Sequence, residues 1–175
     1  MRNHEFDQCM RRIQKGDKTG LKDIYEGYIS YIYAVILGIV RNRENAEDLT
    51  AEFFVRLWSS ADSYRPGGGH KAWMTTIARN MAIDFMRKSG REQLVEEVAD
   101  EAELSVQNSM ENEVVGRMNF RETVAKLTDT ERQIVTMKLA GDMTFKEIAG
   151  ILGMPMGTVT WKYQSSMEKL RRAGV

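Results

Sequence analysis

Cysteine and histidine are nearly absent from this sequence. Cys9 is the single cysteine among 175 residues, which excludes a disulfide framework and a cysteine-rich zinc site. The two histidines, His4 and His70, stand far apart, and neither lies in a metal-binding or nucleophile motif. No Gly-x-Gly-x-x-Gly or Walker-type phosphate loop occurs. We therefore expect no metal, no cofactor and no enzymatic activity.

Long hydrophobic runs and a net charge are lacking as well. No stretch of about 18 apolar residues occurs and the N-terminus is polar, so we expect a cytoplasmic protein with no membrane span and no secretory signal. The 25 basic and 25 acidic residues exclude a uniformly basic coat for nucleic acid but leave room for local basic patches. The apolar fraction of 42% is enough to build packed cores.

Proline is rare, since only Pro66 and Pro155 occur. No Asn-Gly or Asp-Gly hairpin signal stands between alternating runs, and apolar residues recur with the 3.6-residue period of helices. The sequence therefore predicts an all-α fold.

Charge divides the chain into three segments. Residues 1–90 carry 14 basic and 11 acidic side chains, residues 91–118 carry 2 and 8, and residues 119–175 carry 9 and 6. The acidic middle segment has no aromatic residue, which is typical of a linker. We expect two small helical domains, 1–90 and 119–175, joined by a flexible acidic linker over 91–118.

An acidic row marks the first predicted domain. A helix is expected to start near Asn45, whose side chain would cap it. Glu44, Asp48 and Glu52 then recur at i, i+4 spacing outside the core stripe, where like charges repel by a few tenths of a kcal/mol per pair. A basic partner surface would relieve that repulsion, and a solvated acidic face is the alternative.

A glycine-rich loop over residues 64–70 precedes another predicted helix. Three consecutive glycines lose too much entropy to be helical. Polar donors and cations beside such a loop are typical of single-stranded nucleic-acid binding, with an ordinary amphipathic helix as the alternative. The residues concerned are Tyr64 and His70 in the loop and Thr76, Arg79, Asn80, Arg87 and Lys88 on the helix.

The second domain carries the pattern of a helix-turn-helix. Capping boxes of the form T-x-x-E begin at Thr128 and Thr144, and a short turn over 153–156 leads into a last helix with Val159, Tyr163 and Leu170 inward. Its outward face would contact DNA in a major groove, whereas the alternative is a plain helical hairpin. The outward residues are Thr158, Trp161, Lys162, Ser165, Lys169, Arg171 and Arg172.

Taken together, these segments resemble the extracytoplasmic-function group of bacterial sigma factors. Residues 44–54 resemble region 2.2 of that group, and residues 71–84 resemble its regions 2.3 and 2.4. Residues 127–132, 147–149, 152–153 and 157–159 resemble region 4. The resemblance covers about residues 8–90 and 119–172 in the expected order.

The resemblance implies roles for these positions. Asp48, Glu52, Phe54 and Trp58 fall where region 2.2 docks on core RNA polymerase. The loop 64–70, with Lys71 and Asn80 after it, falls where an extruded base of the promoter minus-ten element is captured. Residues 157–169 fall on the helix that reads the minus-thirty-five element.

Departures from the family pattern occur at few positions. Ala51 replaces the usual glutamine, which predicts weaker binding to core polymerase, and His70 replaces the usual aromatic. The last helix has Trp161, Lys162 and Ser165 where serine, arginine and arginine are common, and the missing cation points to a divergent promoter. The resemblance also implies an anti-sigma factor as partner. The alternatives are a helix-turn-helix regulator that acts without polymerase and a helical adaptor.

Overall fold

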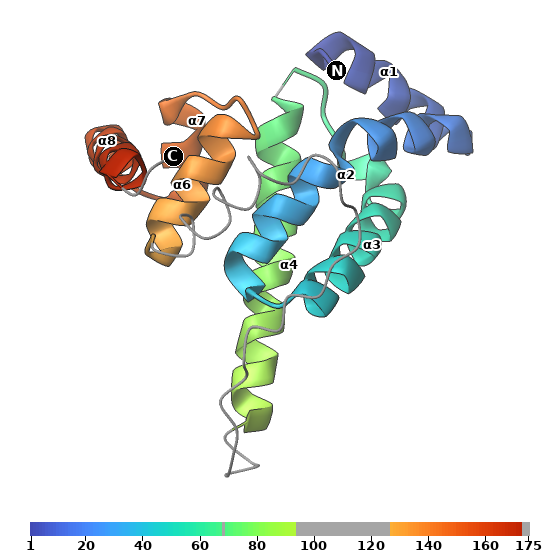
Figure 1. The fold of residues 1–175 in the computed structure, drawn as a ribbon. Coiled ribbons are helices and arrows are strands. Elements are labelled where there is room, and N and C mark those ends of the chain that lie inside the picture. Colours follow the sequence, from blue (N-terminus) through green and yellow to red (C-terminus); the bar gives the residue numbers. More distant parts are fainter. Residues whose placement is uncertain (68, 94–126, 173–175) are drawn as a thin grey trace, which may run out of the picture.

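The computed structural model describes residues 1–67, 69–93 and 127–172. Every regular element within these ranges is helical, which confirms the predicted all-α class. The segment 91–118, which we predicted as a linker, lies outside the described residues except for its first three positions. The elements are α1 (Asn3–Gln14), α2 (Lys18–Val40), α3 (Arg43–Ser59), the short 3-10 helix η1 (Ala61–Ser63), α4 (His70–Gln93), α6 (Asp129–Leu139), α7 (Phe145–Leu152) and α8 (Met156–Arg172) (Figure 1).

Helix α2 is the centre of the N-terminal half, by which we mean residues 1–67 and 69–93. It packs against α1, α3 and α4 (Figure 1). Ile24, Ile32 and Ile36 of α2 are fully buried, and so are the rings of Phe6 from α1 and Phe53 from α3. Burying a side chain of this size contributes about 1.5–3 kcal/mol. This cluster therefore fixes the positions of the surrounding helices.

Helix α2 also differs from one expectation. We expected no segment apolar enough to cross a membrane, yet α2 meets the criteria of length and composition, with a mean hydropathy of 1.3 over its most apolar window. It is the one such helix in the described part of the chain, and 44% of that window is buried inside the structure. A helix enclosed by other helices is apolar on most of its faces, which accounts for its composition.

The start of α3 lies one turn earlier than predicted. Asn42, not Asn45, is the N-cap, and its side chain accepts a hydrogen bond from the Asn45 backbone N–H at 2.9 Å. Arg41 ends α2 in the left-handed conformation with φ 57°, after which Asn42 is extended and ready to cap. The earlier start brings Glu44 onto the helix.

The helix starts and the turn predicted in the C-terminal half, residues 127–172, are confirmed. Thr128 and Thr144 cap α6 and α7, and Glu131 and Glu147 complete the two capping boxes. Gly153 then ends α7 at φ 63°, a left-handed conformation that glycine adopts without strain. Helices α7 and α8 are the predicted helix-turn-helix.

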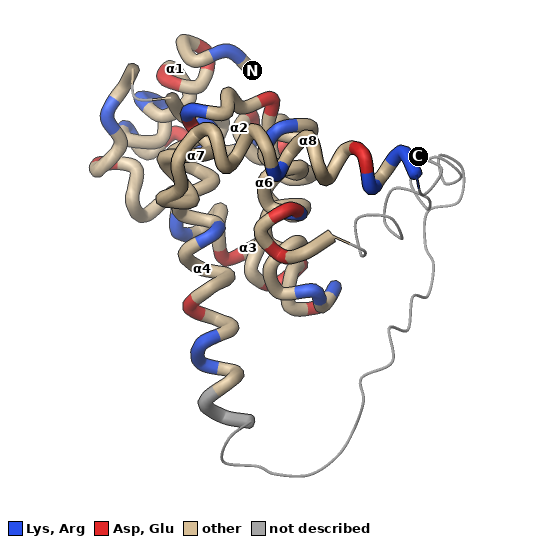
Figure 2. Tube along the Cα trace, turned by 90° about the vertical axis from the view of Figure 1, so that its left-hand side faces the viewer, with Lys and Arg blue, Asp and Glu red and all other residues tan. Residues whose placement is uncertain are grey.

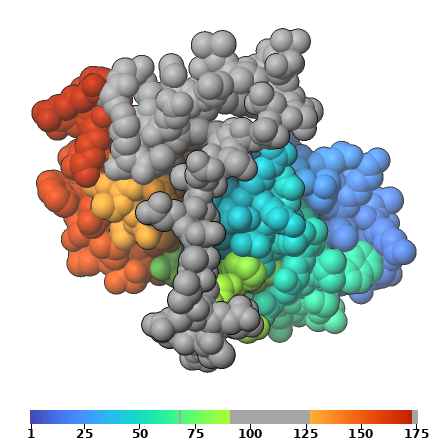
Figure 3. All heavy atoms as spheres, turned by 60° about the horizontal axis from the view of Figure 1, so that its bottom comes forward, coloured from blue at the N-terminus to red at the C-terminus, as the bar shows by residue number. Residues whose placement is uncertain are grey.

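The two halves pack against each other. Helix α6 contacts α2, and α7 contacts α4. Space-filling Figure 3 shows the C-terminal half in orange and red beside the N-terminal half in blue to green. The sequence predicts two helical units but not how they are oriented. Their contact places the C-terminal half against one side of α4.

Candidate nucleic-acid and protein interfaces

Three carboxylates form an exposed row on α3. Glu44, Asp48 and Glu52 lie on the surface at successive turns, while Leu49 and Phe53 face the core. None of the ion pairs between described residues involves these three carboxylates. The row therefore presents unneutralised negative charge, which a basic surface would complement.

An apolar strip accompanies the acidic row. Val55, one turn beyond Glu52, has 69% of its surface exposed. Phe54 is buried, and its ring centroid lies 4.8 Å from that of Tyr25, which is exposed on α2. Trp58 is partly buried against the core. The resemblance names Phe54 and Trp58, whereas the exposed apolar side chains are Tyr25 and Val55. Val55 could have been found from the sequence, because it is an apolar residue that lies outside the core stripe of this helix.

Four of the residues predicted to bind a single strand are exposed along α4. Thr76 and Asn80 occupy successive turns, and Arg87 and Lys88 follow towards the end of the helix. Figure 2 shows basic and acidic residues in turn along this part of α4. Amide and hydroxyl groups hydrogen-bond base edges and cations contact phosphates, so this face suits a single strand of nucleic acid.

The remaining two cations of this set border the C-terminal half. Nε of Arg79 donates to Oε1 of Gln133 on α6 at 3.0 Å, and burial lowers the pKa of Arg79 below its ordinary value. Lys71 lies near Glu147 on α7. Hydrogen bonds from Thr144 lower the pKa of Glu147, and the charge of Lys71 lowers it further. Arg79 is thus turned towards the C-terminal half, and Lys71 carries its charge near that half.

The loop before α4 has glycine at two positions where the backbone is left-handed. Gly67 and Gly69 have φ values of 86° and 82°, which other residues rarely adopt. At its start, the buried Tyr64 donates from its hydroxyl to Oδ1 of Asp7 at 2.6 Å. Arg65 is exposed beside it, and sequence reasoning missed this cation because a loop has no periodicity to mark it.

His70 closes the loop from inside the core. It is only 3% exposed and stacks on Phe6 with the ring centroids 4.5 Å apart. Its ring nitrogens hydrogen-bond the Tyr28 hydroxyl and the Asn3 side chain. Burial lowers the pKa of His70 to about 4, so the imidazole is neutral at pH 7. The sequence assigns Tyr64 and His70 to DNA binding, whereas the structure places both side chains in the core, where they hold the loop.

Helix α8 presents an aromatic and polar surface. Trp161 has 64% of its surface exposed, and Nζ of Lys162 lies 5.9 Å from the centroid of its ring. Thr158 and Ser165 are partly exposed, and Arg171 is exposed near the end of the helix. The predicted inward positions are confirmed, since Val159 and Leu170 are buried and Tyr163 packs against the core. The exposed face carries donors, a cation and an aromatic ring, as major-groove contacts require.

Lys169 is oriented differently from the rest of this face. Its Nζ donates to Oε1 of Glu131 on α6 at 2.6 Å, and that carboxylate side chain is only 8% exposed. Burial by itself would raise the pKa of Glu131, but hydrogen bonds from Lys169 and Thr128 lower it below its ordinary value. Lys169 thus holds α8 against α6.

No metal-binding cluster accompanies these surfaces in the described ranges. Over residues 1–67, 69–93 and 127–172, no group of three or more His, Cys, Asp or Glu side chains is arranged to hold a metal ion. What the arrangement offers is binding chemistry on three helices. Helix α3 is anionic and apolar, α4 is polar and cationic, and α8 is polar, cationic and aromatic.

Two family models match the chain in the order of these surfaces. The model of Sigma-70 region 2 matches residues 24–92, which contain α3 and α4. The model of Sigma-70 region 4 matches residues 117–170, which contain the helix-turn-helix. The chain belongs to the extracytoplasmic-function group of the sigma-70 family.

Individual relatives agree with this sigma factor over nearly its whole length. It is 28% identical over 174 residues to the "ECF RNA polymerase sigma factor SigW" of Bacillus subtilis, covering 93% of both chains. It is 23% identical to "ECF RNA polymerase sigma factor SigK" of Mycobacterium tuberculosis, covering 95% of this chain and 92% of that one.

Two solved structures share its fold. One is the sigma factor RpoE bound to the anti-sigma factor NepR from Bartonella quintana, with a TM-score of 0.73, 22% identity and coverage of 87% of this chain and 94% of RpoE. The other is CnrH bound to the cytosolic domain of CnrY, with a TM-score of 0.63, 17% identity and coverage of 97% and 94%.

Membership of this family gives the chain its class of function. A sigma factor is a transcription initiation factor and acts by binding rather than by catalysis. A helix-turn-helix regulator that acts without polymerase is not favoured, because residues 24–92 match region 2, which such a regulator does not need.

Proposed function

We propose that this sigma factor binds core RNA polymerase through α3, holds the promoter minus-ten element on α4 and reads the minus-thirty-five element with α8. Residues 1–90 would carry the first two activities and residues 119–175 the third. The observation that carries this proposal is the exposed polar face of α4 beside the glycine loop. This face supports strand capture, which a regulator of duplex DNA would not require.

The acidic row supports docking of α3 on a basic surface of polymerase. Glu44, Asp48 and Glu52 have no cationic partner among the described residues, so a cationic partner gains attraction without breaking an existing pair. Val55 and Tyr25 add exposed apolar area next to the charges. An interface with an apolar centre and a charged margin has the usual anatomy of protein–protein contacts.

Helix α4 supports the opening of the promoter duplex. Unstacking and unpairing a base cost a few kcal/mol, so a protein that opens DNA must bind the extruded base. The Asn80 amide can donate to and accept from a base edge, and Thr76 lies one turn away with its hydroxyl already donating to the Ala72 carbonyl at 2.8 Å. Arg87 and Lys88 supply charge for the flanking phosphates.

Helix α8 supports reading of the duplex upstream element. The exposed Trp161 and the partly exposed Thr158, Lys162 and Ser165 lie at the start and middle of the second helix of a helix-turn-helix. This part of the recognition helix enters the major groove in such motifs. Lys162 is the residue best placed for a phosphate, since Lys169 is paired with Glu131.

The substitution Asn80→Ala tests the function proposed for α4. The variant should bind core polymerase normally, because Asn80 is remote from α3 along the chain and exposed on α4. It should form open complexes poorly on duplex promoters and recover on a template already melted at the minus-ten element, where the opening cost is already met. Permanganate reactivity of unpaired thymines measures opening on both templates.

The matched control lies on the same helix. Met86→Gln changes another exposed residue of α4 that lies off the face of Thr76 and Asn80, and it should open both templates like the wild type. Normal opening of the closed duplex by Asn80→Ala would remove α4 from strand capture. Equal defects on both templates would place the fault after melting.

An anti-sigma factor is a further proposed partner. RpoE is solved in complex with the anti-sigma factor NepR, and its fold matches this chain with a TM-score of 0.73. A protein that binds polymerase and promoter DNA acts in the bacterial cytoplasm, which is the location that we propose. Co-purification of the tagged chain with and without excess core polymerase would reveal a competing protein partner.

A further inference from the structure

Helix α1 presents three neighbouring side chains to the glycine loop before α4. Asn3 and Asp7 stand one turn apart on α1, and Phe6 lies on the same face between them. Asp7 accepts a hydrogen bond from the Tyr64 hydroxyl at 2.6 Å, and the Asn3 side chain is hydrogen-bonded to His70. One face of α1 therefore holds both the first and the last residue of the loop.

Phe6 fills the space between the two ends of the loop. It is fully buried, and its ring centroid lies 4.5 Å from that of His70 and 5.4 Å from that of Tyr64. The Tyr64 ring also contacts Trp73 of α4, with the centroids 4.9 Å apart. Packing of these rings fixes where the loop ends lie, and the two polar contacts fix how each end is turned.

The contact between Tyr64 and Asp7 has the geometry of a strong hydrogen bond. A distance of 2.6 Å is typical of a hydroxyl that donates to a carboxylate. Burial raises the pKa of Tyr64 and the hydrogen bond to Asp7 raises it further, so the hydroxyl keeps its proton and donates. Removal of Asp7 would leave a buried hydroxyl without this acceptor, which disfavours the present position of Tyr64.

Between its ends the loop is accessible. Gly67 is exposed, and a Cβ added there would meet no atom of the described residues within 4 Å. Arg65 donates from Nη1 to the carbonyls of Asp62 at 2.9 Å and of Tyr64 at 3.2 Å, which satisfies acceptors at the start of the loop. An extruded base can therefore approach the backbone at Gly67 while the loop ends are already fixed.

We propose that α1 positions the glycine loop for capture of the extruded minus-ten base, with Asp7 and Asn3 as the positioning residues. This inference rests on the function proposed for α4 and the loop beside it. A loop with free ends loses conformational entropy when it closes on a base, and glycine loses more than any other residue. Helix α1 removes part of that cost before the DNA arrives, and such preorganisation increases affinity. Both residues act through the loop ends and not by touching the base.

Substitutions at Asp7 separate its hydrogen bond from its volume. Asp7→Ala removes the acceptor for Tyr64, whereas Asp7→Asn keeps an acceptor oxygen in nearly the same shape. Tyr64→Phe removes the same hydrogen bond from the other side and keeps the ring. Because Asp7 acts through Tyr64, the double variant Asp7→Ala, Tyr64→Phe should lose no more affinity than either single variant. Asn3→Ala tests the other end of the loop.

The first control is on the same helix. Arg12 of α1 forms an ion pair with Asp23 of α2 and donates to Oγ1 of Thr19 at 3.1 Å. Arg12→Ala therefore weakens the attachment of α1 to α2 without removing a contact to the loop. It should behave like the wild type, because the anchors at Asn3 and Asp7 remain.

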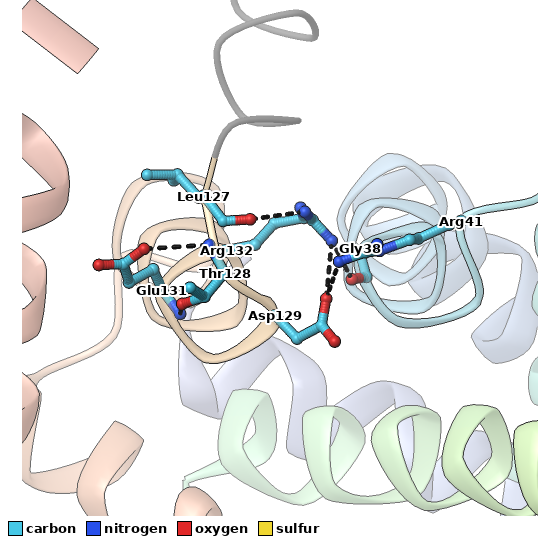
Figure 4. A network of polar contacts seen from close by, with 7 residues as sticks. All are labelled: Gly38, Arg41, Leu127, Thr128, Asp129, Glu131 and Arg132. Carbon is cyan, nitrogen blue, oxygen red and sulfur yellow. Dashed lines mark hydrogen bonds and ion pairs between the residues drawn. The ribbon is translucent and has the colours of Figure 1, made fainter. Parts of the chain in front are cut away.

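The second control is in the polar network that joins the end of α2 to α6 (Figure 4). There Arg132 donates to the Gly38 carbonyl at 3.2 Å, and Arg41 forms an ion pair with Asp129. Arg41 stands 13 positions after Tyr28, which is the α2 residue bonded to the last residue of the loop. This separation is about 20 Å along a helix. Arg41→Ala thus breaks a contact between helices far from the loop and should bind DNA like the wild type.

The measurement is the affinity of the holoenzyme for single-stranded DNA, by fluorescence anisotropy. The first probe is a fluorescein-labelled oligonucleotide carrying the minus-ten sequence selected beforehand with the wild-type holoenzyme. In the other probes an abasic site replaces each base of that sequence in turn, and the wild type should lose affinity at the position of the captured base. Each holoenzyme variant is measured on every probe.

The expected pattern is a loss that depends on one base. Asp7→Ala, Asn3→Ala and Tyr64→Phe should bind the intact probe about tenfold more weakly than the wild type, and Asp7→Asn should stay within about threefold of it. On the probe that lacks the captured base, the variants and the wild type should bind equally, because a loop without a base to hold gains nothing from its position.

A merely structural role for α1 would give a different pattern. Equal losses by Asp7→Ala on every probe would overturn the proposal, and so would wild-type affinity for the intact probe or an equal loss in Arg12→Ala. If Asp7→Ala does not fold, Tyr64→Phe, which keeps its ring, decides by the same comparison. Failure of the proposed function is separate, because then no abasic site would weaken the wild-type holoenzyme and Asn80→Ala would open promoters normally.

Discussion

Lowering the pH should destabilise the N-terminal half through His70. The neutral imidazole is hydrogen-bonded to the Asn3 side chain and to the Tyr28 hydroxyl, and it stacks on Phe6. Protonation would place a positive charge in this buried cluster, where Lys71 and the N-terminal amine also lower the pKa of His70. Asp7 and Glu147 oppose that effect without cancelling it.

The sign and size of the effect follow from the two pKa values. The pKa of His70 is 6.5 in a model compound and about 4 in the folded chain, so the unfolded chain binds the proton more readily. Stability contributed by the neutral imidazole is complete above pH 6.5 and is lost as the pH falls from there towards 4. At pH 5 the loss is about 2 kcal/mol.

Urea unfolding at pH 7 and pH 5 measures this loss. Trp58 and Trp73 report on the N-terminal half, and a Trp161→Phe background removes the tryptophan of α8. The control is His70→Gln, which keeps a hydrogen-bonding side chain but cannot titrate. The wild type should lose about 2 kcal/mol more than this control between the two pH values. Equal losses in both proteins would refute the assignment of the pH dependence to His70.

Further predictions concern the other two surfaces. Asp48→Lys combined with Glu52→Lys should abolish binding to core polymerase in a pull-down while changing stability by no more than about 0.5 kcal/mol, because both carboxylates are exposed and unpaired among the described residues. Unchanged binding by the folded double variant would mean that the acidic row of α3 is only a solvated face and does not contact polymerase. Lys162→Ala should lower the slope of log affinity against log salt by about 0.9 on duplex DNA, whereas Thr158→Ala and Trp161→Ala should alter sequence preference, as competition between duplexes would show. Equal losses by all three variants on every sequence would mean that α8 reads no bases.

The helices could be predicted from the sequence because their signals are local. The capping boxes at Thr128 and Thr144 join residues three positions apart, and the apolar period is read within two or three turns. The start of α3, at Asn42 rather than Asn45, was displaced because two asparagines stand one turn apart. The left-handed Arg41 decided between them, and no propensity marks an arginine for that conformation.

The availability of site residues could not be predicted, because distant partners set it. The Tyr64 hydroxyl donates to Asp7 of α1, 57 positions earlier in the chain. The His70 ring stacks on Phe6, which also belongs to α1. Arg79 meets an acceptor on α6, 54 positions later. A spacing pattern shows which residues share a helix face but not what packs against that face.

Lys169 is another residue whose availability is set by a distant partner. Its substitution can separate a role in packing from a role in DNA binding. The sequence assigns it to the phosphate-binding face, but its Nζ is paired with the buried Glu131 at 2.6 Å. Lys169→Ala should therefore destabilise the C-terminal half by about 1 kcal/mol at pH 7, a value reduced for the half-exposed lysine. Faster hydrogen exchange of α6 amides would measure the loss.

The pH dependence and the salt dependence of this variant follow from the same pairing. The pKa of Glu131 is lowered in the folded chain, so the stabilisation is present above the ordinary glutamate pKa of 4.5 and is lost as the pH falls below it. The difference in α6 exchange between Lys169→Ala and the wild type should therefore shrink towards pH 4. The salt slope of duplex binding should stay at the wild-type value, in contrast to Lys162→Ala, because a lysine held by Glu131 releases no counterion from DNA. If Lys169→Ala lowers the salt slope of duplex binding by about 0.9 and leaves hydrogen exchange in α6 unchanged, then Lys169 contacts a DNA phosphate instead of stabilising the C-terminal half.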